Sequence, residues 1–291
     1  MENSPKILVG TLYSGESQFK DCTDSLRSQS YKKWTQKIFK HLSNKEGHDT
    51  LYEYFMDNSN DFDLFIKLDA DMVLLRETCL EEIISLFQSD YKLSHLESVV
   101  QDYLTDSLMM GLHVFRSHVK WRKSNERLFV DRKPVLEGDK VDLWQSPAPF
   151  VVHNPNPTNY QAFHFGVHRA LKALQPGRFL FRISQYNSQA KVLNTIWDNY
   201  ARSKNIKQGF AALGAYLVFK DEIPKNMYDY TNPKLHAEFL QKYSTLNKED
   251  LFGLMNAFWF DENNLFRKVR GRILLHRILT KPLRTINLLP K

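Results

Sequence analysis

Residues 62–75 have the sequence FDLFIKLDADMVLL, in which two aspartates separate two apolar runs. The first run, from Phe62 to Asp69, predicts a buried strand. Asp69 and Asp71 therefore close this strand, and ligands in open α/β sheets bind at the carboxyl ends of the strands. Two carboxylates in this position suit Mg²⁺ or Mn²⁺, which keep several waters and take further oxygen ligands from a substrate's phosphates.

The Asp-x-Asp pattern alone is not specific, because a chain with 19 aspartates is expected to contain such a pair by chance, and Asp61 with Asp63 is a second copy. Position distinguishes the two copies. Asp61 and Asp63 open the strand on its polar side, whereas Asp69 and Asp71 have apolar neighbours on both sides, where an uncompensated charge is costly to bury. The alternative role for Asp69 and Asp71 is the capping of a helix.

Strands and helices alternate through the first 90 residues. Two further strands are expected at residues 6–13 (KILVGTLY) and 34–42 (WTQKIFKHL), and helices at residues 16–28, 48–56 and 78–89. This alternation predicts βαβ units, and hence an α/β fold with a mostly parallel central sheet and helices on both faces.

The second half of the chain has a looser pattern. Strands are expected at residues 107–116, 150–153 and 161–165 and helices at residues 167–175, 186–203 and 233–243, while residues 211–219 fit either type. Residues 120–149 contain three prolines and are expected to form a substrate loop. We therefore expect one α/β domain over residues 1–225 and a helical extension over residues 226–291.

Composition restricts the location of the protein. With 42% hydrophobic and 25% charged residues the chain is globular, and its first apolar block, Ile7 to Val9, is too short for a signal peptide. No run approaches the roughly 18 apolar residues that a membrane-spanning helix needs. Cys22 and Cys79 show no metal-ligand spacing, which fits a reducing compartment. We therefore expect a cytoplasmic protein.

Positive charge is concentrated at the end of the chain. Residues 267–291 hold eight Lys and Arg and no acid, and subtracting these eight from the formal charge of +7 leaves the remainder at −1. This basic tail is expected to bind an anionic membrane surface, with another protein or domain as the alternative partner. A nucleic-acid-binding protein that uses the tail is a rival class, but the nearly neutral body has no RNP, KH or zinc-finger pattern, so no nucleic acid is expected.

Three segments resemble, in the same order, the motifs of family 2 glycosyltransferases. Residues 9–16 (VGTLYSGE) are similar to the opening strand and nucleotide loop of that family, and residues 25–34 (SLRSQSYKKW) are similar to its first-helix signature. Residues 68–71 (LDAD) follow in the place of the metal motif. The resemblance covers about the first 90 residues well and the rest loosely.

The resemblance implies a GT-A fold, a nucleotide-diphospho-sugar donor, a divalent Mn²⁺ or Mg²⁺ and inversion at the anomeric carbon. By position it implies that Thr11, Tyr13 and Glu16 lie at the nucleoside, and that Asp69 lies at the ribose and joins Asp71 at the metal. Residues 1–90 would form the nucleotide-binding half and residues 91–225 the acceptor half. The expected reaction is transfer, from a UDP-sugar, to a glycan or lipid-linked acceptor in surface polysaccharide synthesis.

One departure concerns base recognition. The family usually ends its second strand with an acidic pair before Gly-Ser, whereas this chain has residues 41–49, HLSNKEGHD. The identity of the base, and with it the uridine assumption, therefore stays open.

The second half supplies candidates for a further ligand. His153, His164, His168 and Arg169 lie within 17 residues. The resemblance implies a histidine ligand from this half, for which His164 is the first choice and His168 and His153 are the reserves; the alternative is a hydrogen-bonded structural imidazole. Arg169 is expected to neutralise the diphosphate, with a solvated surface arginine as the alternative.

The catalytic base is a carboxylate near the acceptor hydroxyl. Residues 197–202 (WDNYAR) are weakly similar to the family's late acidic stretch, which makes Asp198 a candidate, with Asp142 and Asp139 as competitors. The alternative for Asp198 is an exposed position on an amphipathic helix. A nucleotidyltransferase would need a Gly-Ser helix opening or a glycine-rich arginine loop, which the sequence lacks, and a catalytically inactive donor-binding domain is the remaining rival.

Overall fold

A computed structural model describes residues 4–125, 131–143, 148–174, 179–224 and 232–261. The chain divides into two compact units, of which the first ends at Thr158 and the second begins at Asn159, while residues 232–236 group with the first. This division differs from the boundary at residue 225 that the sequence suggested. The basic tail, residues 267–291, lies outside the described residues.

An eight-stranded sheet organises the first unit, in the order β2-β1-β3-β6-β5-β10-β4 with β9 beside β5. Its strands are β1 (Ile7–Tyr13), β2 (Trp34–Lys40), β3 (Leu64–Lys67), β4 (Met72–Leu74), β5 (Leu93–Asp102), β6 (Ser107–Arg116), β9 (Asp139–Leu143) and β10 (Val151–His153). The pairings give β1, β2, β3, β5, β9 and β10 one direction and β4 and β6 the opposite one. The predicted α/β class is confirmed, and the sheet is mixed.

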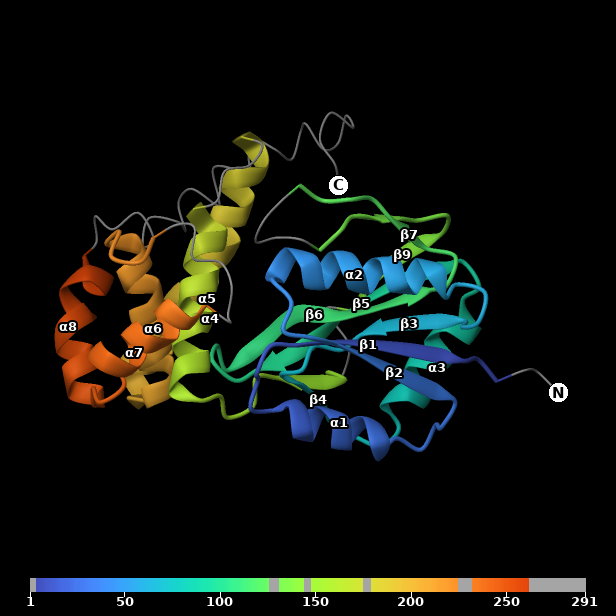
Figure 1. The fold of residues 1–291 in the computed structure, drawn as a ribbon, viewed down its shortest axis with the longest axis horizontal. Helices are drawn as coiled ribbons and strands as arrows, with labels where there is room; N and C mark the ends of the chain where they lie inside the picture. The colour runs from blue at the N-terminus through green and yellow to red at the C-terminus, as the bar shows by residue number, and fades with distance from the viewer. Residues whose placement is uncertain (1–3, 126–130, 144–147, 175–178, 225–231, 262–291) are drawn as a thin grey trace. The chain divides into compact units, whose positions relative to one another are not determined.

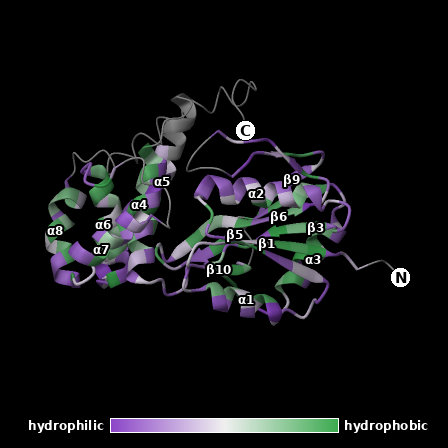
Figure 2. Cartoon of the chain, viewed as in Figure 1, coloured by the Kyte–Doolittle hydropathy of each residue, from purple (hydrophilic) through white to green (hydrophobic). Residues whose placement is uncertain are grey.

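Helices cover both faces of this sheet, with α2 (Asn44–Asp57) on one side and α1 (Phe19–Arg27) and α3 (Cys79–Ser89) on the other (Figure 1). Successive strand residues point to opposite faces, so Phe65 packs with α2 whereas Ile66 packs with α1 and α3. Figure 2 shows hydrophobic residues along the central strands. A side chain at Gly10 would begin 2.8 Å from the Phe55 ring, so glycine there lets α2 lie close to β1.

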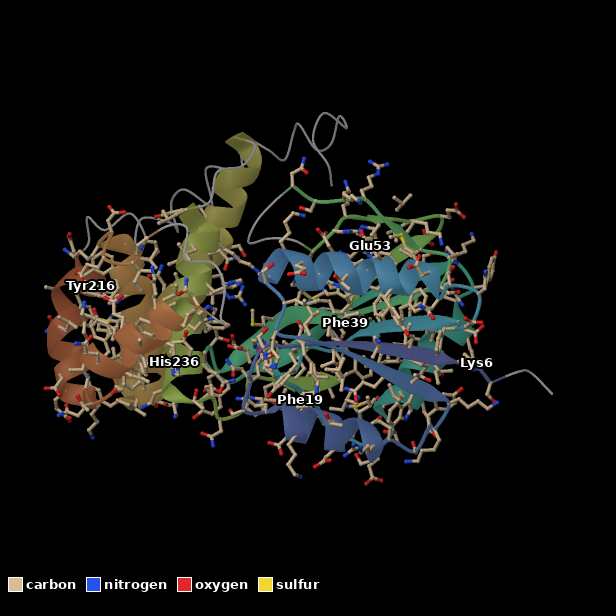
Figure 3. The ribbon with its side chains drawn as sticks, viewed as in Figure 1. Lys6, Phe19, Phe39, Glu53, Tyr216 and His236 are labelled. Atoms are coloured by element: carbon tan, nitrogen blue, oxygen red, sulfur yellow. The ribbon has the colours of Figure 1, made fainter. Side chains whose placement is uncertain are left out.

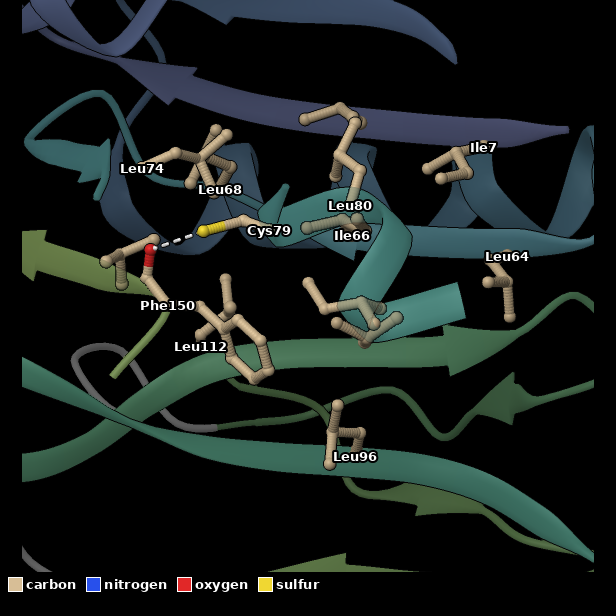
Figure 4. Close-up of a cluster of buried hydrophobic side chains, with 14 of the residues drawn as sticks. Ile7, Leu64, Ile66, Leu68, Leu74, Cys79, Leu80, Leu96, Leu112 and Phe150 are labelled. Atoms are coloured by element: carbon tan, nitrogen blue, oxygen red, sulfur yellow. Dashed lines mark hydrogen bonds between the residues drawn. The ribbon is translucent and has the colours of Figure 1, made fainter. Parts of the chain in front are cut away.

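The face under α1 and α3 holds the larger core cluster (Figure 4). In it the Cys79 thiol donates to the backbone oxygen of Phe150 at 3.3 Å. Cys22 is buried in the same cluster, and both cysteines are free. The two thiols therefore serve as core side chains in this unit.

The middle section contains short strands. In residues 120–149, which the sequence suggested as a loop, β7 (Lys120–Trp121) pairs with β8 (Pro134–Val135), and β9 joins the main sheet. Trp121 packs with α2 in the second core cluster. This part of the chain is thus tied to the sheet through its described residues.

The regular elements described beyond Thr158 are helices. Its helices are α4 (Asn159–Leu174), α5 (Phe179–Ser203), α6 (Ile206–Phe219), α7 (Pro233–Lys242) and α8 (Lys248–Phe260). The strand predicted at residues 161–165 is wrong, because these residues belong to α4, and residues 211–219 are helical. Both runs are buried on several sides, so their apolar pattern carries no helical period. None of the described helices is long and apolar enough to be a membrane span.

Candidate functional site

One edge of the sheet gathers ionisable side chains. Because β1, β3, β5 and β10 run in the same direction, their carboxyl ends meet at this edge. Glu16 follows β1, Asp69 and Asp71 follow β3, Asp102 ends β5 and His153 ends β10. Four carboxylates and one imidazole thus come from four separate parts of the sequence.

A chain of contacts fixes Asp71. Its Oδ2 lies 3.4 Å from Nε2 of His153, and Nδ1 of His153 lies 2.6 Å from Oδ1 of Asp102. Asp102 is fully buried and accepts hydrogen bonds from the backbone N–H and the hydroxyl of Thr105, both at 2.7 Å. The imidazole of His153 therefore lies between two carboxylates.

This arrangement determines the charges of His153 and Asp71. Burial opposes a proton on His153, but Asp71 and Asp102 outweigh burial and raise its pKa to about 10. Burial would raise the pKa of Asp71, but His153 outweighs it and the pKa falls below its ordinary value. Asp71 is therefore an anion at neutral pH, and its orientation is set by a charged imidazole.

Asp69 is held differently. Its Oδ2 accepts a hydrogen bond from Nζ of Lys67 at 3.0 Å, whereas its Oδ1 is buried and has no hydrogen-bond partner among the described residues. Lys67 is buried, which lowers its pKa, but Asp131 and Asp69 outweigh burial and the pKa rises well above its ordinary value. A buried carboxylate oxygen without a partner costs free energy, so this atom indicates a position for a cation or a donor.

Glu16 forms a group of three carboxylates with Asp69 and Asp71. Its Oε2 accepts from the backbone N–H of Ser14 at 2.6 Å. Burial, and then the charges of Asp71 and Asp69, raise its pKa to about 7. Mutual repulsion of nearby carboxylates is relieved by a divalent cation, so the oxygen donors of this group fit Mg²⁺ or Mn²⁺.

Cys22 lies beneath these carboxylates. Burial, together with Asp71, Asp69 and Glu16, raises the pKa of its thiol to about 12. The thiol therefore stays protonated at neutral pH and is neither a nucleophile nor a metal ligand in this state.

Thr11 and Tyr13 lie at the end of β1 as expected. Thr11 is fully buried, and its hydroxyl accepts a hydrogen bond from Nε2 of Gln36 at 3.0 Å. Tyr13 is half-buried and stacks on Phe19, with ring centroids 4.2 Å apart. Phe19 is the first residue of α1 and is labelled in Figure 3. Their role at a nucleoside stays a prediction.

The segment after β10 closes against the first loop. The backbone N–H of Asn154 donates to the backbone oxygen of Asp71 at 2.7 Å, and Asn154 has a left-handed φ of 55°. Buried Gln18 donates to Oδ1 of Asn154 at 3.2 Å and to the oxygen of Pro155 at 3.0 Å. Sequence reasoning missed Gln18, Lys67 and Asp102. It named His153 as a reserve metal ligand, and the structure places Nε2 of this residue 3.4 Å from Oδ2 of Asp71.

The other predicted residues belong to β9 and to helices of the second unit. Asp142 is in β9, where its Oδ1 lies 3.1 Å from Nζ of Lys140, and its competitor Asp139 begins the same strand. His164 and His168, with ring centroids 6.2 Å apart, are in α4, where burial lowers the pKa of His164 to about 4.

Arg169 and Asp198 also belong to the second unit. Nη1 of Arg169 donates to Oε1 of Gln189 at 3.2 Å, and the guanidinium lies 4.8 Å from the Phe165 ring centroid. Asp198 is in α5, where its backbone oxygen accepts from Nε of Arg202 at 3.3 Å. The roles of Arg169, Asp198, Asp142 and the histidines of α4 stay predictions.

Comparison with known proteins gives no family for the chain. No protein-family model and no curated protein matches it. Among solved structures it is similar to S. aureus TarS, at 11% identity and a TM-score of 0.33 over 80% of this chain and 50% of that chain. It is also similar to S. aureus TarS 1–349, at 10% identity and a TM-score of 0.34 over 74% of this chain and 92% of that chain.

The chain thus spans half the length of the first of these structures. Likeness at such TM-scores carries no functional argument, so the assignment of a function rests on the residues of the site.

Proposed function

We propose that the chain is a metal-dependent, inverting glycosyltransferase of GT-A type. It would move a sugar from a nucleotide-diphospho-sugar, for which a UDP-sugar is the first candidate, to a glycan or lipid-linked acceptor in surface polysaccharide synthesis. The observation that carries the proposal is the buried Oδ1 of Asp69, which has no hydrogen-bond partner among the described residues and lies near the charged Asp71 at the carboxyl edge of the sheet. The three motifs that resemble family 2 glycosyltransferases support it.

Asp69 and Asp71 are the residues that would hold Mn²⁺ or Mg²⁺, with His164 as a further candidate ligand. When bound, such an ion stabilises the negative charge that develops on a leaving diphosphate. The chain's own contribution is orientation: Lys67 fixes one oxygen of Asp69, and His153 fixes Asp71. Residues that are already oriented lose little freedom when the donor binds.

The donor nucleoside would lie at the end of β1. The stacked rings of Tyr13 and Phe19 offer an aromatic surface for a base, and Glu16 follows in the same loop. In the second unit, Arg169 is the candidate for the diphosphate. Glu16 and Asp69 supply hydrogen-bond acceptors suited to ribose hydroxyls.

The acceptor hydroxyl needs a carboxylate that accepts its proton on the face of the sugar opposite the leaving group. Asp198 is the first candidate, and Asp142 is the alternative. Asp198→Asn should keep nucleotide affinity and lose transfer, and Asp142→Asn should leave both unchanged. The reverse pattern would assign the base to Asp142.

Thermal unfolding with a panel of nucleoside diphosphates, with and without Mn²⁺, tests the proposal, because a ligand that binds the native state raises the unfolding temperature. We expect stabilisation by UDP only when Mn²⁺ is present, and loss of that shift in Asp71→Asn. Asp61→Asn is the matched control, because Asp61 is exposed and belongs to the second Asp-x-Asp pair. Indifference to every nucleotide would remove the proposal, and binding without turnover would leave a catalytically inactive donor-binding domain.

Peripheral contact of the basic tail with the inner face of an anionic membrane is a separate part of the proposal. Deletion of residues 267–291 should weaken co-sedimentation with vesicles of anionic lipid in low salt. Equal co-sedimentation of the full and shortened chains would exclude this role.

A further inference from the structure

A second group of ligand-type side chains lies inside the sheet of the first unit. His95 and Glu97 are in β5 and His113 is in β6, where Glu97 and His113 face each other in register. One ligand atom from each of the three lies within 4.8 Å of the others. His95 also stacks on Phe115, with ring centroids 4.3 Å apart, so the group lies on the face of the sheet that Phe115 shares with α2.

The two imidazoles are spaced like neighbouring ligands of one ion. Nε2 of His95 lies 3.1 Å from Nδ1 of His113. Two nitrogens at about 2.0–2.1 Å from one tetrahedral zinc ion lie roughly 3.3 Å apart. A small rotation of the rings would therefore let both nitrogens bind the same ion, which would replace the proton that they share.

The contact between the two histidines is suited to metal binding. Nε2 of His95 and Nδ1 of His113 face each other at hydrogen-bond distance, so at least one of these two nitrogens carries a lone pair that a metal could take.

Lys140 competes for the carboxylate of this group. Its ammonium pairs with Glu97 and lies 3.1 Å from Oδ1 of Asp142, and both partners lie opposite each other in the pairing of β5 with β9. An ion that binds Glu97 must displace this ammonium.

We propose that His95, Glu97 and His113 form a second metal site, selective for Zn²⁺ or a similar transition metal, in which Lys140 limits the affinity. Two imidazoles and one carboxylate suit zinc, whereas Mg²⁺ prefers oxygen ligands alone. The proposal does not rest on the transferase activity, because none of its three ligands is among the residues proposed for the donor, its metal or the catalytic base.

The test measures zinc binding to the full chain after all metal has been removed. The chain carries Asp71→Asn, which weakens the carboxylate site. Equilibrium dialysis should give one Zn²⁺ per chain. His113→Gln and Glu97→Gln should each weaken binding by about tenfold or more, the size of effect typical when a group that supports a metal site is changed. His118→Gln is the matched control, because His118 is exposed and bonds to Ser94 outside the group.

Lys140→Gln should change the zinc affinity in the opposite direction. Removal of the competing ammonium should strengthen zinc binding by about tenfold, because it leaves Glu97 and Asp142 without their cation. In the unsubstituted chain, titration with Zn²⁺ should shift the imidazole NMR signals of His95 and His113 and leave that of His118 unchanged, a readout that does not depend on how well a variant folds. The absence of zinc binding, equal binding by His113→Gln, or unshifted signals of His95 and His113 would overturn the site.

Discussion

Asp69 and Asp71 stand two residues apart and are oriented by different partners. Lys67 donates to Oδ2 of Asp69, whereas Oδ1 of Asp69 is buried without a hydrogen-bond partner in the described structure. His153, which also contacts Asp102, keeps Asp71 charged. Position in the strand made the pair predictable, because both follow an apolar run. The partners were not predictable, because Asp102 and His153 come from strands far away in the sequence.

Asp102→Asn tests the support of Asp71. The amide keeps the shape of the side chain and its acceptor for Thr105 but removes the charge that holds the proton on His153. We expect the affinity for Mn²⁺ in the presence of UDP to fall by about tenfold to a hundredfold, as is common when the partner of a ligand is changed. Calorimetric titration measures it, and an unchanged affinity would show that His153 does not support Asp71.

A buried histidine makes stability depend on pH. Burial lowers the pKa of His164 to about 4, below the value of about 6.5 in an unfolded chain. The unfolded state therefore binds the proton first, so this contribution is present above about pH 6.5 and is lost as the pH falls toward 4.

The expected result is a smaller loss of the free energy of unfolding between pH 6.5 and 4 in His164→Gln than in the unsubstituted chain. The difference is at most about 1.4 kcal/mol per pH unit for one proton. Comparing the two chains removes the effect of Glu16, whose raised pKa acts in the opposite direction. Urea unfolding at several pH values measures both slopes, and parallel slopes would contradict the burial of a neutral His164.

At the scale of elements, α4 and α6 approach closely at two glycines. A Cβ at Gly166 would lie 1.8 Å from the backbone oxygen of Ala211, and one at Gly214 would lie 2.0 Å from that of Phe163. These contacts involve backbone atoms, which cannot move aside as a flexible side chain can. The two glycines are therefore required by the crossing of the helices.

Gly166→Ala should lower the free energy of unfolding by about 3 kcal/mol or more, at the upper end of what overpacking costs. Gly253→Ala is the matched control, because Gly253 is in α8 and a Cβ there meets nothing within 4 Å. That variant should gain up to about 1 kcal/mol from helix propensity. Denaturant unfolding compares the two, and a neutral Gly166→Ala would contradict the packing of α4 on α6.

Sequence patterns predicted the early elements and missed β5. Residues 107–116 were expected as a strand with the bounds that β6 has. In β5 the alternation of apolar residues changes phase, because the pairing with β6 shifts between Ser98 and Val99, and His95 and Glu97 point into a polar group. A strand with a shifted register and polar inward residues does not show the period of two.

At the scale of the whole molecule, the strand directions in the sheet of the first unit determine the position of the candidate site. Six strands share one direction, so their carboxyl ends lie at one edge of the sheet. Glu16, Asp69, Asp71 and His153 lie at or after these strand ends, although they are distant in the sequence. The order of the strands is set by pairings that no local pattern reveals. The carboxylate pair could therefore be predicted from the sequence, whereas the contacts that charge and orient it could not.

The most direct test of the account is a crystal of the chain with Mn²⁺ and UDP, measured for the anomalous signal of manganese. We predict a manganese peak on the carboxylates of Asp69 and Asp71, with the buried Oδ1 of Asp69 among the atoms that face the ion or its waters. A peak elsewhere in the molecule, with the oxygen of Asp69 still without a partner, would contradict it.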